Sequence, residues 1–152
     1  MRKRCIRRHW ARTDPIALAI AGATITAEVD LDKLRLRELS AIQNFATGQA
    51  TPTDFRDLCD MLNLAETMAS MGIGPEALTS CSDLESFLLA SKAAHDETGT
   101  LPMPQAGIAA MRDVYAYHDL QRTSVDRSTY ERAIEKTRNR IRSAHPSVKE
   151  LA

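Results

Sequence analysis

The segment from Thr51 to Gly72 constrains the fold most, because it carries a complete set of helix signals. Thr51 and Pro52 are typical of an N-cap followed by proline in the first turn, and Asp54 complements the positive end of a helix. Apolar side chains then recur at three- and four-residue spacing, at Phe55, Leu58, Leu62, Ala65 and Ala69. Gly72 followed by Ile73 has the form of a Schellman stop. We therefore predict a long amphipathic helix here.

Before this segment the sequence predicts an arm, a short helix and a long helix. Residues 1–13 have no apolar period, and Asp14-Pro15 then indicates an N-cap and a short helix that stops near Gly22. Residues 24–29 are rich in β-branched side chains and are expected to form an extended connection. Asp30 or Asp32 begins the long helix, which ends before Gly48. We expect its inward side chains to be Leu34, Leu39, Ile42 and Phe45.

Three further helices are expected after Gly72. The first begins at Gly74-Pro75 and ends before Gly99, with a candidate break at Ser80–Ser82. The second has one inward face, formed by Ile108, Met111, Tyr115 and His118. The last begins with a capping box at Ser128–Glu131 and ends at His145-Pro146. Its inward face comprises Tyr130, Ile134, Thr137, Ile141 and Ala144.

These segments together predict an all-α protein. The expected architecture is a helical bundle of four or five long helices, plus a short N-terminal helix and a basic N-terminal arm. Aromatic residues are only 5% of the chain while Ala, Leu and Met are frequent, a mixture that favours helices because unbranched side chains lose little rotamer freedom there. The 152 residues suffice for one domain. We assign 1–13 to the arm, 14–146 to a single helical domain and 147–152 to a C-terminal tail.

The net charge of zero conceals a strong segregation of charge. Residues 1–13 carry six basic and no acidic side chains, and residues 122–152 carry eight basic and four acidic ones. Residues 14–121 carry six basic and sixteen acidic side chains, so an acidic body lies between two basic ends. Such asymmetry indicates binding partners more than the total charge does.

The basic arm is the first candidate binding element. Its cations could neutralise phosphates while its indole stacks on a base, or the arm could contact the acidic body of its own chain or of a partner protein. The candidate partner-binding residues in the arm are Arg2, Lys3, Arg4, Arg7, Arg8, Trp10 and Arg12.

Two more charged surfaces are expected on helices. Arg132, Lys136 and Arg140 are spaced at four residues and form a cationic stripe on the last helix, flanked by Arg138. The stripe could follow a phosphate backbone, or it could be an ordinary solvated face. Asp54, Asp57 and Asp60 are spaced at three residues and form an acidic edge, which could dock a cationic partner or simply be the wet side of an amphipathic helix.

The motifs of catalysis and metal binding are missing from the sequence. It contains no H-E-x-x-H motif and no glycine loop for phosphate, so we predict no catalytic residue, no metal and no cofactor. His95 and His118 each precede a carboxylate, but consecutive helical residues point in different directions, and His118 is expected to be a hydrogen-bonded core residue. The few, widely spaced cysteines favour a reducing cytoplasm. The apolar run at 15–25 imitates a secretory signal, but Asp14 interrupts it and it is too short to cross a bilayer, so no membrane partner is expected.

Several stretches resemble a group of small accessory proteins carried by phages and prophages of Gram-negative bacteria. Besides the Arg-rich opening they are Asp14-Pro15-Ile16, Gly48-Gln49-Ala50-Thr51, Leu62-Asn63-Leu64-Ala65-Glu66, Gly72-Ile73-Gly74, Tyr117-His118-Asp119 and the helix end at 138–142. The resemblance implies a phage origin and an accessory role, for instance in subverting a host system such as a CRISPR complex.

The sequence thus favours a non-catalytic phage-type accessory protein that binds a host protein or nucleoprotein complex, as an inhibitor of host defence of the anti-CRISPR kind. The first alternative is a nucleic-acid-binding accessory protein that uses the arm and the last helix. The second is a small hydrolase centred on His95 or His118.

Overall fold

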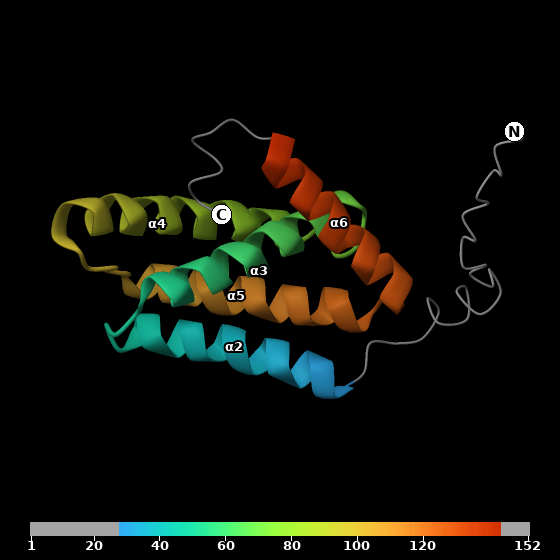
Figure 1. Cartoon of the computed structure of the whole chain (residues 1–152), viewed down its shortest axis with the longest axis horizontal. Helices are drawn as coiled ribbons and strands as arrows, with labels where there is room; N and C mark the ends of the chain where they lie inside the picture. Colours follow the sequence, from blue (N-terminus) through green and yellow to red (C-terminus); the bar gives the residue numbers. More distant parts are fainter. Residues whose placement is uncertain (1–27, 144–152) are drawn as a thin grey trace, which may run out of the picture.

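The computed structural model describes residues 28–143 as five helices, with no strand among those residues (Figure 1). The helices are α2 (Glu28–Ala46), α3 (Pro52–Ser70), α4 (Ala77–Thr98), α5 (Gln105–Thr123) and α6 (Arg127–Ser143). The predicted all-α bundle is confirmed. The predicted arm, short first helix, final helix stop and C-terminal tail lie outside the described residues.

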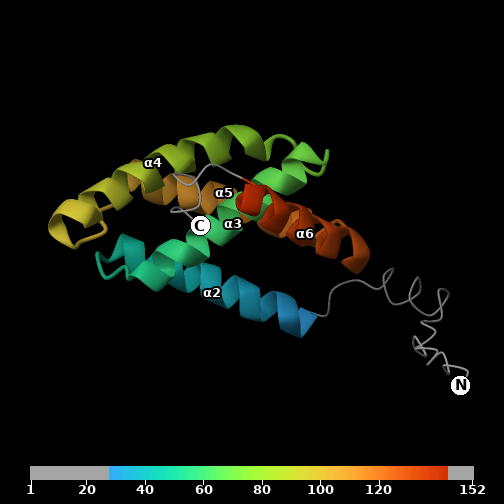
Figure 2. The ribbon, with the colours of Figure 1, turned by 45° about the horizontal axis from the view of Figure 1, so that its top comes forward.

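Helix α3 is the centre of the bundle, because it packs against α2, α4, α5 and α6. In Figure 1, α2, α4 and α5 run along the long axis of the molecule, and α3 crosses them obliquely. Helix α6 lies over α3 in both views (Figure 2). The acidic α2 therefore lies on one side of α3 and the basic α6 on another.

Both ends of α3 form as the sequence predicts. The Asp54 backbone N–H donates to the Thr51 side chain, and the Thr51 N–H donates to the Asp54 carboxylate at 2.8 Å, which completes a capping box. At the other end Gly72 has φ +84°, and the Ile73 N–H donates to the Met68 carbonyl at 3.0 Å. This is the six-to-one hydrogen bond of a Schellman motif, and glycine provides the left-handed residue that it needs.

The core has a large and a small part. The large part joins α2, α3, α4 and α5 and includes Ile42, Leu58, Leu84 and Met111. The small part lies under α6, where Met68 of α3 packs with Tyr130 and Ala133. Helix α6 is therefore held by a separate apolar cluster.

The inward face of α2 differs from the prediction. Glu38 is only 2% exposed, whereas Leu39, predicted to point inward, is 45% exposed. Ile42 and Phe45 are buried as expected, and Leu34 is half-buried. The helix also begins at Glu28, so the predicted extended connection is wrong for Glu28 and Val29. Burial of a glutamate on this face requires a buried cation, which another helix supplies.

Two other local predictions are wrong. Helix α4 continues without a break through residues 80–82, because Cys81 is buried in the core and keeps the helix packed there. Helix α6 does not begin with a capping box at Ser128. It begins at Arg127, and the Thr129 N–H donates to the Asp126 carboxylate at 2.7 Å, so Asp126 is the capping residue.

Candidate functional site

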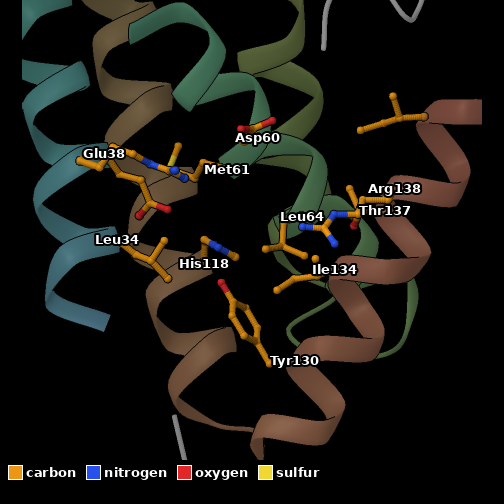
Figure 3. A pocket seen from close by; sticks show the side chains of 12 residues that line it. Leu34, Glu38, Asp60, Met61, Leu64, His118, Tyr130, Ile134, Thr137 and Arg138 are labelled. Atoms are coloured by element: carbon orange, nitrogen blue, oxygen red, sulfur yellow. The ribbon is translucent and has the colours of Figure 1, made fainter. Parts of the chain in front are cut away.

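A groove of about 330 Å³ lies between α2 and α6, with residues of α3 and α5 at its base (Figure 3). We call it the α2–α6 groove. Its apolar lining consists of Leu34, Met61, Leu64, Ile134 and Ile141. Its polar lining consists of Arg37, Glu38, Asp60, His118, Tyr130, Thr137 and Arg138. Pockets that bind ligands are usually of this kind, mainly apolar with a few polar groups, and run from about 300 to 1,000 Å³.

His118 lines this groove although its side chain is almost completely buried, at 1% exposure. Its Nδ1 lies 3.4 Å from Oε1 of Gln121. The Gln121 amide nitrogen donates to the Ala65 and Ile73 carbonyls at 3.1 and 2.8 Å, so Oε1 is the free acceptor and the N–H of His118 belongs on Nδ1. Nε2 is then an unprotonated acceptor.

The charge state of His118 agrees with that tautomer. Burial lowers the pKa of His118 to about 4, and the nearby Arg122 guanidinium lowers it further. The imidazole is therefore neutral at physiological pH. The hydrogen bond to Gln121 also confirms the prediction that His118 is a hydrogen-bonded core residue.

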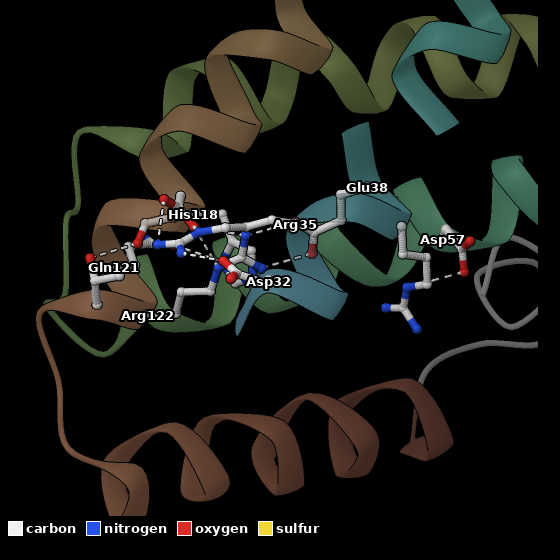
Figure 4. A network of polar contacts seen from close by, with 10 residues as sticks. Asp32, Arg35, Glu38, Asp57, His118, Gln121 and Arg122 are labelled. Atoms are coloured by element: carbon white, nitrogen blue, oxygen red, sulfur yellow. Dashed lines mark hydrogen bonds and ion pairs between the residues drawn. The ribbon is translucent and has the colours of Figure 1, made fainter. Parts of the chain in front are cut away.

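Beside His118 lies a buried ion pair between α2 and α5 (Figure 4). Arg122 binds Glu38 through both carboxylate oxygens, with Nη1–Oε1 at 3.0 Å and Nη2–Oε2 at 2.9 Å. Arg122 also binds Asp119 at 2.9 Å, and Asp119 binds Arg35 of α2 at 2.8 Å. This chain of charges fixes α2 against α5 at the base of the groove.

The pKa shifts in this network show how burial and pairing compete. Burial raises the pKa of Glu38, because loss of hydration outweighs its contacts with Arg122. The pKa of Asp119, which is more exposed, is lowered: burial opposes the shift, but the hydrogen bonds from Arg35 and Arg122 prevail. The pKa of Arg122 is raised in spite of its burial, because Glu38 and Asp119 stabilise its charge.

The predicted cationic stripe on α6 is divided by the structure. Arg140 faces α3, where Nη1 lies 2.8 Å from the Glu66 carboxylate and Nη2 donates to the Asn63 carbonyl at 3.1 Å. Arg132 and Lys136 are exposed, and Arg132 donates to the Thr129 hydroxyl. Arg138 is exposed at the rim of the α2–α6 groove. The stripe thus comprises one residue that anchors α6 and three that face solvent.

The predicted acidic edge does not form as one surface. Asp54 is buried in the capping box and also accepts a hydrogen bond from Asn44 at 3.0 Å. Asp57 lies 3.5 Å from the guanidinium of Arg37. Asp60 alone is exposed, at the rim of the groove, where partial burial raises the pKa of its carboxyl. The wet-side interpretation applies to Asp60 but not to Asp54.

The two histidine–carboxylate neighbours do not form catalytic pairs. His118 binds Gln121, while Asp119 points away to Arg35 and Arg122. His95 is half-buried at the end of α4, and the neighbouring Asp96 binds Lys92 at 3.1 Å. The arm residues, from Arg2 to Arg12, lie outside the described part of the chain.

Within the described residues there is no cluster of three metal-ligating side chains. None of the described helices is both long and apolar enough to cross a membrane. Cys59 and Cys81 are free and buried, and burial raises the pKa of their thiols to about 12 and about 11. Both thiols are therefore protonated and unreactive at physiological pH.

Sequence reasoning missed the polar residues that build the groove. Glu38 and Arg122 are 84 positions apart, so no local pattern connects them. Gln121 had the same disadvantage, although a glutamine, an arginine and a histidine within four positions at the end of an apolar helical face would have been a usable signal.

Comparisons with known proteins found no relative: no family model, no curated protein and no solved structure matches the chain.

Proposed function

We propose that the chain is a non-catalytic accessory protein of phage type that acts in the cytoplasm of a bacterial host. It binds a host protein or nucleoprotein complex and thereby inhibits a host defence system, as anti-CRISPR proteins do. The proposal is supported by the segregation of charge in the sequence and by the unpaired cations on α6.

The observation that carries the proposal is the state of the α6 cations. The six arginines and lysines of α6 outnumber its two glutamates. Four of them make no ion pair with any described residue: Arg132, Lys136, Arg138 and Arg142. In the described part of the chain this is otherwise true only of Arg56 and Arg112 among arginines and lysines.

Unpaired, solvent-facing cations on one helix suit a binding surface. Charges of one sign steer a partner of opposite sign and exclude partners of like sign. The rest of the described chain is acidic, so a partner with a negative patch is attracted to α6 and repelled elsewhere. The basic arm would add to the same attraction.

The test is capture of host proteins from a Gram-negative bacterial lysate by the full chain. We expect R132E/K136E/R142E and a chain without residues 1–13 each to lose most of the captured partner, because each removes cations that contact it. R56E/R112E is the matched control, since it reverses unpaired cations on α3 and α5, and it should capture normally. Unchanged capture by the α6 variant and by the truncated chain would refute the proposal.

Nucleic acid is the alternative partner, favoured by the same cations together with those of the arm. This alternative requires a mobility shift with DNA or RNA at low salt that weakens steeply as salt rises, because counterion release drives such binding. If R132E/K136E/R142E removed the shift and left protein capture intact, nucleic acid would replace protein as the partner.

A further inference from the structure

We infer that the α2–α6 groove receives one aromatic side chain of the partner protein, a tryptophan or tyrosine, whose N–H or O–H donates a hydrogen bond to Nε2 of His118. The inference rests on the proposed function, because it supplies the specific contact that the α6 cations alone lack. Three observations point to this occupant.

The first observation is the acceptor at the base of the groove. His118 is 1% exposed, and Gln121 engages only its Nδ1. No hydrogen bond from a described residue reaches Nε2, and the Tyr130 hydroxyl nearby interacts with Arg122 instead. Because a buried acceptor without a donor costs free energy, the base of the groove favours a ligand that brings an N–H or O–H.

The second observation is the shape and character of the walls. Leu34 on one side and Ile134 and Ile141 on the other leave about 330 Å³ between them, at the lower end for ligand pockets. In Figure 3 the side chains of Leu34, Leu64 and Ile134 surround the approach to His118. Such a space suits one ring held at the end of a larger molecule. Tryptophan and tyrosine are the side chains that most often fill such pockets at protein interfaces.

The third observation is the charge at the rim. Arg138 is exposed there without an ion pair to a described residue, and Arg37 faces it from α2. The face of an aromatic ring carries negative charge density, so a ring in the groove attracts both guanidinium groups. Asp60, on α3, accepts a second hydrogen bond from the donor or from the partner's backbone.

The first test uses indole and 1-methylindole as probes, because they have almost the same shape and differ in the N–H. Each is titrated into the full, ¹⁵N-labelled chain and followed by NMR. We expect indole to shift the His118 Nε2 resonance, as accepting a hydrogen bond does, and 1-methylindole to bind roughly three- to tenfold more weakly, as the loss of one hydrogen bond predicts. Equal affinities would refute the role of His118, and no binding of indole at millimolar concentration would refute the site.

Two groove variants locate the probe. I134W fills the groove from α6 and L34F fills it from α2, so both should abolish indole binding; two are used in case one fails to fold. The matched control is L89W on α4, where the leucine is 45% exposed away from the groove, and it should bind indole normally. If indole binds both folded groove variants as well as the control, the probe lies elsewhere and the inference is wrong.

The last arm of the test identifies the source of the ring. A short peptide with a central tryptophan should bind more tightly than free indole and more tightly than the same peptide with phenylalanine. A peptide no tighter than indole would make the groove a small-molecule site. Indole binding that appears only in W10F would make Trp10 of this chain the occupant. Either result overturns the partner-protein assignment.

Failure here is distinguishable from failure of the proposed function. If the probes do not bind but R132E/K136E/R142E still loses its captured partner, the groove assignment falls and the binding function stands. If the probes bind as expected but charge reversal leaves capture unchanged, the groove stands and the role of the α6 cations falls.

Discussion

At the scale of the residue, the dominant feature is the Glu38–Arg122 pair. Taking a carboxylate and a guanidinium out of water costs several kcal/mol for each ion, and their mutual attraction repays this only with good geometry and further hydrogen bonds. Arg122 has both: it grips Glu38 through two oxygens, binds Asp119, and lies 5.8 Å from the ring centroid of Tyr115. The pair therefore fixes how α2 meets α5 more than it adds to stability.

Removing one partner of this pair should cost far more than removing both. We expect R122M to lower the free energy of unfolding by about 3–5 kcal/mol, because it leaves the Glu38 carboxylate buried without a cation. The double variant E38L/R122M should regain most of that loss. Urea unfolding followed by circular dichroism measures both. A double variant as unstable as the single one would mean that the pair contributes through more than mutual charge compensation.

His118 should make stability depend on pH. Folding lowers its pKa from 6.5 to about 4, so between these pH values the unfolded chain binds more protons than the folded chain. The free energy of unfolding should therefore fall as the pH drops from 6.5 to 4, by up to about 3 kcal/mol from this group. H118Q, which cannot be protonated, should show a shallower fall in urea unfolding at the same pH values. An unchanged slope would mean that His118 does not titrate in this way.

At the scale of the element, the ends of helices follow local chemistry. The Thr51–Asp54 box and the Gly72–Ile73 stop were predictable, because each depends on residues within six positions of one another. The start of α6 shows the limit of such reasoning. Both Asp126 and Ser128 are good capping residues, and the choice between them depends on where Tyr130 must point to reach Met68.

This choice can be tested with a matched pair of variants. D126A should lower the urea midpoint, because it removes the acceptor for the Thr129 N–H in the first turn of α6. S128A should leave the midpoint nearly unchanged, because Ser128 already lies inside the helix. The reverse order of effects would restore the capping box at Ser128 that the sequence predicts.

The polar interior could not be predicted, for a physical reason. Periodicity finds apolar faces, so it placed Ile42, Leu58 and Met111 correctly, but it also assigned Leu39 to the core and left Glu38 outside. Burial of Glu38 becomes favourable only when Arg122, 84 residues away, is held opposite it. The candidate groove has the same origin, because its walls come from α2 and α6 and its base from α3 and α5.

At the scale of the whole molecule, the bundle is an α2–α5 body to which α6 is added. Helix α3 contacts every other described helix, whereas α6 packs on α3 through a small cluster around Met68 and the Arg140–Glu66 ion pair. The groove lies at this junction, so its width depends on how firmly α6 is held. A protein that binds a partner through α6 and the groove benefits if α6 can adjust without unfolding the body.

Hydrogen exchange should therefore show α6 opening before the rest of the bundle. We expect the amides of α6 to exchange faster than those of α3, because fewer buried contacts hold α6. M68A should speed exchange in α6 selectively, since Met68 is fully buried and is the α3 residue of its cluster. L84A is the matched control: it makes a cavity of similar cost, about 2–5 kcal/mol, in the large core, and should speed exchange in α4 and its neighbours instead. If M68A accelerates all five described helices equally, α6 and the body form one cooperative unit, and the width of the groove is fixed by the fold.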